Sequence, residues 1–208
     1  AIFNGVFLPG EALPEDQLTK ALGASRTPVR EALMRLKHEG LIQISPRKGA
    51  RVAELSAEEA DNLLEAREIY ETAFFDRAVT AVNRDEFKQL RDAFKEAEGN
   101  LTAVTDDPEL YEQTCTEYLK IDYDFHRLLV SAANNRFWLE SYDQLLDKMR
   151  VYSFHLMLKQ APVFNQSRKE HSSILDSILS EDYSEAKWLL RQHIRNFKDQ
   201  FIVDIPFS

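Results

Sequence analysis

The amino-acid sequence predicts a mainly α-helical protein in two parts: an N-terminal winged helix-turn-helix with a small β wing, followed by an all-α antiparallel helical bundle. Three observations lead to this fold class. Two short helical patterns separated by a glycine come first, and two short alternating segments around a basic turn follow them. From residue 57 onward, apolar residues recur every three or four positions in long runs, which is typical of amphipathic helices that pack together.

The first two predicted helices are separated by a tight turn. Residues 14–23 indicate a short helix that ends at a glycine C-cap, Gly23, and residues 24–36 indicate a second helix. The apolar stripe of the second helix consists of Val29, Ala32, Leu33 and Leu36. The basic and hydroxyl residues left at its exposed start are Arg26, Thr27 and Arg30. Such a helix start behind a tight turn is typical of a helix-turn-helix whose second helix contacts DNA.

A basic hairpin follows the two helices. Residues 41–44 and 50–53 alternate as two strands, and residues 45–49 form the turn between them. Three cations within five residues and one glycine surround this turn: Arg47, Lys48, Gly49 and Arg51. A solvated hairpin tip would explain these charges if the hairpin stood alone. Beside a helix-turn-helix, a basic wing favours contact with DNA phosphates.

The charge along the chain separates the two parts. The 208 residues carry a formal net charge of −9, which is unusual for a DNA-binding protein. Residues 1–55 hold eight Lys and Arg against six Asp and Glu, a balance of +2, whereas residues 56–208 hold eighteen against twenty-nine, a balance of −11. The basic part contains the predicted recognition helix, as DNA binding requires. We therefore expect a DNA-binding domain at 1–55 and an all-helical domain at 56–208.

Cysteine content and hydropathy indicate the compartment. The single cysteine, Cys115, excludes an internal disulfide. The sequence has no apolar run that approaches the roughly 18 residues of a membrane-spanning helix, and no signal peptide is visible in it. These features predict a cytoplasmic protein without a membrane partner.

The acidic part has helical periodicity throughout. Its apolar spacing and turn residues predict helices over 57–82, 85–99, 109–133 and 137–158, a loop at 160–162, and a final helical pair that turns at 181–183. Ser56, followed by Glu58 and Glu59, is expected to cap the first of these helices.

Four residues of the predicted bundle have the spacing of a metal site. Asp122 and His126 stand four apart and share one face of their helix, although such a pair is common by chance. His171 lies eleven residues before Asp182 and His193 eleven after it, so an antiparallel pair that turns there places both imidazoles at one level. Three imidazoles and one carboxylate inside a bundle suit a borderline divalent ion. The other histidines do not fit this geometry and are expected to be structural or exposed: His38 and His155.

Leu13 to Val52 resembles the winged-helix domain of the GntR transcription regulators. The matching residues are Gly10-Glu11-Ala12-Leu13, Leu18-x-x-x-Leu22-Gly23-x-Ser25-Arg26-Thr27-Pro28-Val29-Arg30-Glu31-Ala32-Leu33-x-x-Leu36, Glu39-Gly40-Leu41 and the wing Gly49-Ala50-Arg51-Val52. The remainder resembles the FadR-type effector domain of this family, the FCD class, in its metal-binding branch. The residues that match there are Arg67-x-x-x-Glu71, Asp122-x-x-x-His126, His171 and His193.

The resemblance implies a transcription regulator whose operator affinity is modulated by a small organic acid bound near one divalent metal ion per chain. Zinc is the first choice of ion, with nickel and manganese as alternatives. Arg67 and Arg150 lie on segments that can reach the bundle interior and are the candidates to neutralise the acid. A homodimer is expected because helix-turn-helix proteins read pseudo-palindromic DNA with two recognition helices. One departure from the family pattern is Asp16, an acid where many members carry a DNA-contacting residue.

Other roles for the metal site stay open from the sequence. The ion could be purely structural and tie the helices together, or it could itself be the signal. In a metal-dependent hydrolase the ion would activate water beside an acid or base, for which Asp124 and Asp147 are the candidates. Asp124 is two residues from Asp122 and should face away from it, and a hydrolase gives the DNA-binding segment no role. The sequence therefore favours a regulator without catalytic residues.

Overall fold

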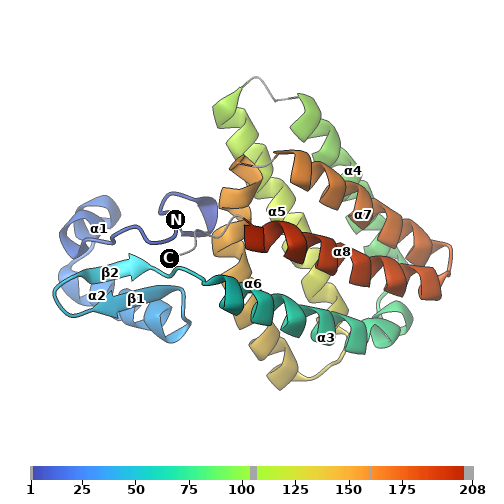
Figure 1. Cartoon of the computed structure of the whole chain (residues 1–208), viewed down its shortest axis with the longest axis horizontal. Coiled ribbons are helices and arrows are strands. Elements are labelled where there is room, and N and C mark those ends of the chain that lie inside the picture. The colour runs from blue at the N-terminus through green and yellow to red at the C-terminus, as the bar shows by residue number, and fades with distance from the viewer. Residues whose placement is uncertain (1, 104–106, 160, 204–208) are drawn as a thin grey trace.

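A helix-turn-helix with a hairpin leads directly into a bundle of helices, which confirms the predicted fold class (Figure 1). The computed structural model describes residues 2–103, 107–159 and 161–203. The N-terminal elements are the 3-10 helix η1 (Ile2–Asn4), α1 (Glu15–Leu22), α2 (Arg26–His38), β1 (Ile42–Ser45) and β2 (Gly49–Val52). The bundle elements are α3 (Ala57–Ala81), α4 (Arg84–Ala103), α5 (Pro108–Ser131), α6 (Arg136–Lys159), α7 (Ala161–Leu179) and α8 (Tyr183–Val203).

The helix-turn-helix depends on one glycine and on the apolar face of its second helix. Gly23 ends α1 in the left-handed conformation, with φ of 60°, where a side chain would be strained. Val29 and Leu33 of α2 are buried, whereas Arg26 and Arg30 remain exposed at the start of that helix. Burial of the stripe therefore leaves the basic end of α2 facing solvent.

The hairpin is a short antiparallel pair with a tight basic turn. It pairs from Ile42 opposite Val52 to Ser45 opposite Gly49. Both strands reach one residue further toward the turn than the sequence predicted, because Arg47 takes a left-handed φ of 71° and closes the turn within three residues.

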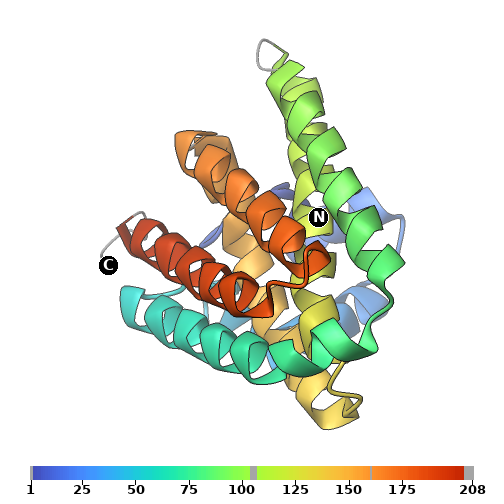
Figure 2. The same ribbon diagram turned by 90° about the vertical axis from the view of Figure 1, so that its right-hand side faces the viewer.

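Five helices of the bundle form a closed ring in the order α3, α8, α7, α4 and α5, and α5 returns to α3. Figure 2 shows α3 and α8 side by side, with α7 next to α8 and α4 along the right-hand edge. α6 packs outside the ring, chiefly against α5. The largest fully buried side chains include Phe75, Phe94, Tyr118, Phe125 and Tyr142. Within the described part of the chain, no helix combines the length and apolarity that crossing a membrane requires.

The residues at the starts of α3 and α7 explain where these two helices begin. Ser56 caps α3 as predicted: its Oγ accepts from the backbone N–H of Glu59 at 3.1 Å, and its own N–H donates to Glu59 Oε2 at 2.9 Å. α7 begins at Ala161, inside the predicted loop, and Gln160 lies outside the described residues. The loop prediction was wrong for Pro162, because a proline in the first turn of a helix loses only an N–H that has no helical partner.

The end of α4 differs from the prediction. The helix does not stop at Gly99 but continues to Ala103. Leu101 is buried and extends the apolar stripe of Phe94 and Ala97 by one more turn. Burial of a leucine side chain contributes about 1.5–3 kcal/mol, which outweighs the roughly 1 kcal/mol that a glycine costs inside a helix.

Candidate metal centre

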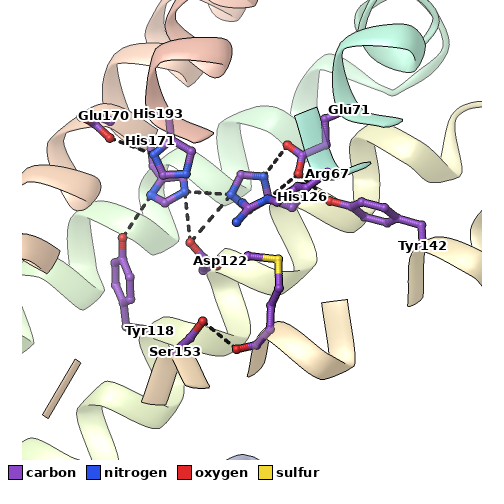
Figure 3. A network of polar contacts seen from close by, with 11 residues as sticks. Arg67, Glu71, Tyr118, Asp122, His126, Tyr142, Ser153, Glu170, His171 and His193 are labelled. Atoms are coloured by element: carbon purple, nitrogen blue, oxygen red, sulfur yellow. Dashed lines mark hydrogen bonds and ion pairs between the residues drawn. The ribbon is translucent and has the colours of Figure 1, made fainter. Parts of the chain in front are cut away.

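Three helices of the ring bring the four predicted ligand residues together at its interior (Figure 3). Asp122 and His126 come from α5, His171 from α7 and His193 from α8, and one ligand atom from each lies within 4.8 Å of the others. Nε2 of His171 lies 3.1 Å from Nε2 of His126 and 3.1 Å from Oδ1 of Asp122. The three imidazoles are buried, while Asp122 keeps 26% of its side chain exposed.

Each imidazole directs its Nδ1 away from this cluster toward a hydrogen-bonding partner. The partners are Glu71 Oε2 at 2.7 Å for His126, Tyr118 Oη at 3.1 Å for His171, and Glu170 Oε2 at 2.9 Å for His193. Partners that accept from Nδ1–H keep the proton on that nitrogen and leave the Nε2 lone pair directed at the centre. This is the arrangement in which an imidazole binds a metal ion through Nε2.

Glu71 is a fully buried carboxylate with bonds to both of its oxygens. Besides the imidazole of His126, it accepts from Arg67 Nε at 2.7 Å and from Tyr142 Oη at 2.5 Å. Burial alone would raise the pKa of Glu71, but His126 and Arg67 outweigh burial and lower this pKa to about 2. Glu71 is therefore ionised at neutral pH and orients the His126 ring.

Burial also sets the protonation of the ligand residues. It is the largest influence on His126 and His193 and lowers the pKa of both imidazoles below the ordinary value. Burial raises the pKa of Asp122, but hydrogen bonding and charge at His171 outweigh it and hold that pKa well below the usual range. Neutral imidazoles and an ionised carboxylate are the forms that bind metal ions.

A small cavity of about 30 Å³ adjoins the cluster. Asp122 and His193 lie in its wall together with the two arginines predicted to bind an anion, Arg67 and Arg150. Arg67 is buried, and its Nη2 has no hydrogen-bond partner among the described residues. Because buried polar groups are normally hydrogen-bonded, a guanidinium nitrogen left over beside a cavity is suited to accept an anion.

The outer partners of the histidines were missed by the sequence analysis. Tyr118, Asp122 and His126 recur every four residues on one face of α5, so that spacing contained a usable signal. Glu71 matched a family pattern but had no role assigned, and it stands 55 positions before His126. Glu170 precedes His171 directly, yet it bonds to the histidine of the neighbouring helix.

The predicted DNA-contacting residues all lie on exposed parts of the N-terminal region. They are Arg26, Thr27 and Arg30 at the start of α2, and Arg47, Lys48, Gly49 and Arg51 in the hairpin. The Nη1 atom of Arg51 donates to the carbonyl of Gly10 at 2.9 Å. Part of the hydrogen-bonding capacity of Arg51 therefore holds the wing to the preceding loop.

Two acids of α1 pair with the arginines of α2. Asp16 Oδ1 lies 3.0 Å from Arg26 Nη2, and Glu15 Oε2 lies 2.7 Å from Arg30 Nε. Asp16, the departure from the family pattern, thus faces an arginine of the next helix. The Glu15 contact uses only the Nε of Arg30, so the two terminal nitrogens of that guanidinium remain available for a base or phosphate.

The residues weighed for other roles lie apart from the cluster. Asp124 is exposed in a groove between α4 and α5, as its spacing from the ligand predicted. Asp147 lies 3.9 Å from Arg150 on α6. His38 is exposed on α2, and the side chain of His155 lies outside the described part of the structure.

Comparison with protein families and curated proteins agrees with this architecture. Residues 1–52 match the bacterial regulatory proteins of the gntR family, and residues 62–196 match the FCD domain. The HTH-type transcriptional regulator YdhC of Bacillus subtilis is 27% identical over 198 residues, which cover 94% of this chain and 83% of that protein. The HTH-type transcriptional repressor RspR of Escherichia coli is 26% identical over 210 residues, which cover 96% of this chain and 88% of that protein.

Solved structures share the fold. A GntR transcriptional regulator from Rhodococcus aligns with a TM-score of 0.76 at 24% identity, over 98% of this chain and 93% of its own. A structure described as a metal-free FCD domain aligns with a TM-score of 0.51 at 16% identity, over 73% of this chain and 96% of its own. The FCD match alone spans more than half of the chain, and the relatives are named as regulators rather than enzymes. The chain therefore belongs to the GntR family of bacterial transcription regulators, in the FadR-type subfamily that carries an FCD domain, and its activity is DNA binding rather than catalysis.

Proposed function

We propose that this regulator binds operator DNA with an affinity that is set by a small organic acid at a metal centre in its helical bundle. In this proposal residues 1–55 are the DNA-binding domain, and residues 56–208 bind the ion and the acid. One observation carries the proposal: three imidazole rings and one carboxylate converge inside the bundle, and each imidazole is oriented by a partner on its Nδ1.

One divalent ion per chain fits the donor set. The four proposed ligands are Asp122, His126, His171 and His193. Imidazole nitrogens with a carboxylate oxygen suit zinc first, and nickel and manganese next. The fold is shared with a structure described as a metal-free FCD domain, which supports a metal in domains of this type. When bound, the ion supplies positive charge and coordination positions for an oxygen ligand within a domain whose formal balance is −11.

The side chains that line the cavity beside the cluster can pair with a small carboxylate. Arg67 of α3 offers its Nη2, and Arg150 offers a second guanidinium from another helix, α6. Hydroxyl side chains of Thr116, Ser153 and Ser167 also line this space. A small hydroxy- or dicarboxylic acid therefore finds partners for its charges and for its hydroxyl groups.

The DNA contacts in this proposal are those of a winged helix bound as a homodimer. Arg26, Thr27 and Arg30 enter the major groove, and the hairpin residues Arg47, Lys48, Gly49 and Arg51 meet the phosphates. Two copies are needed because pseudo-palindromic operators present two half-sites. Ligand in the bundle acts by favouring one arrangement of the two winged helices over another.

The experiment is a thermal-shift screen of small carboxylates on zinc-loaded wild type and on His193→Ala. Acids that stabilise the wild type and not the variant support binding at the centre. Stabilisation that persists equally in His193→Ala would place the acid elsewhere and leave the ion a structural role. Operator binding that follows zinc concentration in the absence of any acid would instead make the ion itself the signal.

A further inference from the structure

The N-terminal part of the chain docks on one short stretch of α6, residues 150–154, which is called the strip below. Tyr152 donates its hydroxyl to the carbonyl of Ala53 at 2.8 Å. Phe154 packs so closely on Gly5 that its ring leaves no room for a Cβ at that position, and Gly5 has a φ of 68°. Figure 1 shows this N-terminal segment lying beside α6. The strip therefore fixes the position of the DNA-binding part relative to the bundle.

Arg150 belongs to this strip and also to the cavity beside the metal centre. Its guanidinium carbon lies 4.5 Å from the ring centroid of Phe3 in η1 and 4.7 Å from that of Tyr123 in α5. Among the described residues its nearest carboxylate is that of Asp147, at 3.9 Å, which is beyond hydrogen-bond distance. The guanidinium thus rests against two aromatic rings while its N–H groups stay available for an anion.

The cavity wall includes the DNA-binding part itself. Phe3 and Asn4 of η1 line the cavity together with Asp122 and His193. Phe3 also lines an apolar cavity inside the helix-turn-helix, where Leu33 of α2 lies in the same wall. One aromatic side chain therefore borders both the proposed ligand site and the interior of the DNA-binding domain.

We infer that the ligand site is composite: the bundle supplies the metal centre and Arg150, and Phe3 and Asn4 of the DNA-binding domain complete it. This inference rests on the proposed function. An acid whose carboxylate pairs with Arg150 and whose polar groups reach Asn4 holds both parts of the chain at once, and so fixes the docked position of the winged helix. The ligand then distinguishes docked from undocked arrangements by direct contact, which is the requirement for coupling.

DNA binding in this inference distinguishes the docked from the undocked arrangement, so variants that weaken the docking contact should alter DNA affinity even without ligand. We would measure operator affinity of Arg150→Gln and Phe3→Leu by gel shift at fixed salt. The matched control is Arg136→Gln on the same helix, whose side chain is 78% exposed and pairs with Glu140. We expect a change of about fivefold or more for both test variants and none for the control. Operator affinities equal to that of Arg136→Gln would overturn the inference.

The second measurement tests the composite wall with malate as the probe. Asn4→Asp keeps the size of the side chain but places a negative charge on the cavity wall, so malate binding to the zinc-loaded full chain should weaken by about fivefold or more. Val6→Ala, in the same segment but 64% exposed and outside this cavity, is the control. Zinc content is measured in parallel and should stay at one ion per chain in both variants. Malate affinity that is equal in Asn4→Asp and Val6→Ala would remove η1 from the site.

The two measurements separate this inference from the function on which it rests. Failure of malate and of a wider carboxylate panel to bind zinc-loaded wild type would contradict the organic-acid effector and with it the composite site. In that case the gel shifts would still show whether Arg150 and Phe3 couple the two parts of the chain. Malate binding to wild type with unchanged affinity in Asn4→Asp, Phe3→Leu and Arg150→Gln would keep the effector and refute the composite site.

Discussion

Each of the three proposed ligand histidines has one nitrogen for the candidate centre and the other for a partner, so the partner decides which tautomer is present. Glu71 does this for His126 and is itself held by Arg67 and Tyr142. The pair of buried acid and buried histidine would be costly if either group lost its partner. The chemistry of the centre therefore extends one layer beyond the residues that would touch the ion.

Substitution of Glu71 should weaken metal binding although Glu71 is not a proposed ligand. Glu71→Gln keeps the shape but removes the charge that orients His126, and we expect metal affinity to fall about 10- to 100-fold. The measurement is a zinc competition titration against a chromophoric chelator. The control is Glu65→Gln, an exposed carboxylate on the same helix. An affinity equal to that of Glu65→Gln would show that the outer partner has no influence on the centre.

The metal-free protein should lose stability as the pH falls from about 7.5 to 5.5. The pKa values of His126 and His193 lie below the ordinary value, so across this range the unfolded chain binds more protons than the folded one. The loss begins near the unfolded pKa of about 6.5. Because the pKa of Glu71 is also lowered, to about 2, its contribution is fully present above the usual carboxyl pKa and is lost at more acidic pH, as the pH falls from that value through about 2.

Urea unfolding in the presence of a chelator, at several pH values, measures this loss. His193→Gln should flatten the dependence on pH, because one buried histidine no longer takes up a proton on unfolding. His38→Gln, which changes an exposed histidine of α2, should keep the wild-type slope. A wild-type midpoint that stays constant between pH 7.5 and 5.5 would contradict the assignment of neutral buried imidazoles.

At the scale of elements, local signals predicted most helix boundaries. Gly23 ends α1 and Ser56 starts α3, because a left-handed cap and a side-chain cap are properties of short segments. The end of α4 could not be predicted from Gly99, because burial of Leu101 against other helices decides it. A local signal is thus overridden where a later residue of the same stripe finds tertiary contacts.

In the candidate site, the four proposed ligands could be predicted from local spacing, but their outer hydrogen-bonding partners could not. The i, i+4 spacing of Asp122 and His126 is a local signal, and so is the equal sequence separation of His171 and His193 from their turn. These two signals predicted that the four side chains meet. The hydrogen bond between Glu71 and His126 depends on α3 lying next to α5 in the ring. The order of the helices in the ring cannot be predicted from the spacing of residues within one helix.

The start of α2 should contribute strongly to DNA affinity. Arg30→Ala removes a guanidinium whose Nε pairs with Glu15 and whose terminal nitrogens remain available, and loss of a bidentate base contact costs about 1–3 kcal/mol. Gel-shift titration at constant salt measures the loss. Arg35→Ala, which changes an exposed arginine in the last turn of the same helix, is the control and should bind like wild type. Equal affinities of the two variants would refute the role of Arg30.

The wing should act on phosphates rather than on sequence. Lys48→Ala should weaken operator and unrelated DNA to the same extent and reduce the salt dependence by a slope of about 0.9 for one lost phosphate contact. Lys37→Ala, in the last turn of α2, serves as the control. Affinities measured at three salt concentrations decide the question, and a loss restricted to the operator would mean that the wing reads bases.

At the scale of the whole molecule, the closed ring places the candidate metal centre where a bound ion would stabilise the bundle. The proposed ligands come from three of the five ring helices, and α5 touches α7 and α8 less than its neighbours α3 and α4. An ion held by all three helices would therefore link elements across the ring. It would also offset part of the −11 balance of residues 56–208.

Zinc should raise the melting temperature of the full chain. A ligand that binds only the folded state stabilises it by about 2.7 kcal/mol when present at 100 times its Kd, which corresponds to roughly 5–10 °C for a domain of this size. The measurement compares chelator-treated protein with the same sample after zinc is added back, followed by calorimetry. His171→Ala should lose the zinc-dependent increase, whereas His38→Ala should keep it because His38 lies in the DNA-binding part. An equal increase in His171→Ala would mean that zinc stabilises the chain from another site, since His171 contributes the nitrogen that lies nearest to both His126 and Asp122.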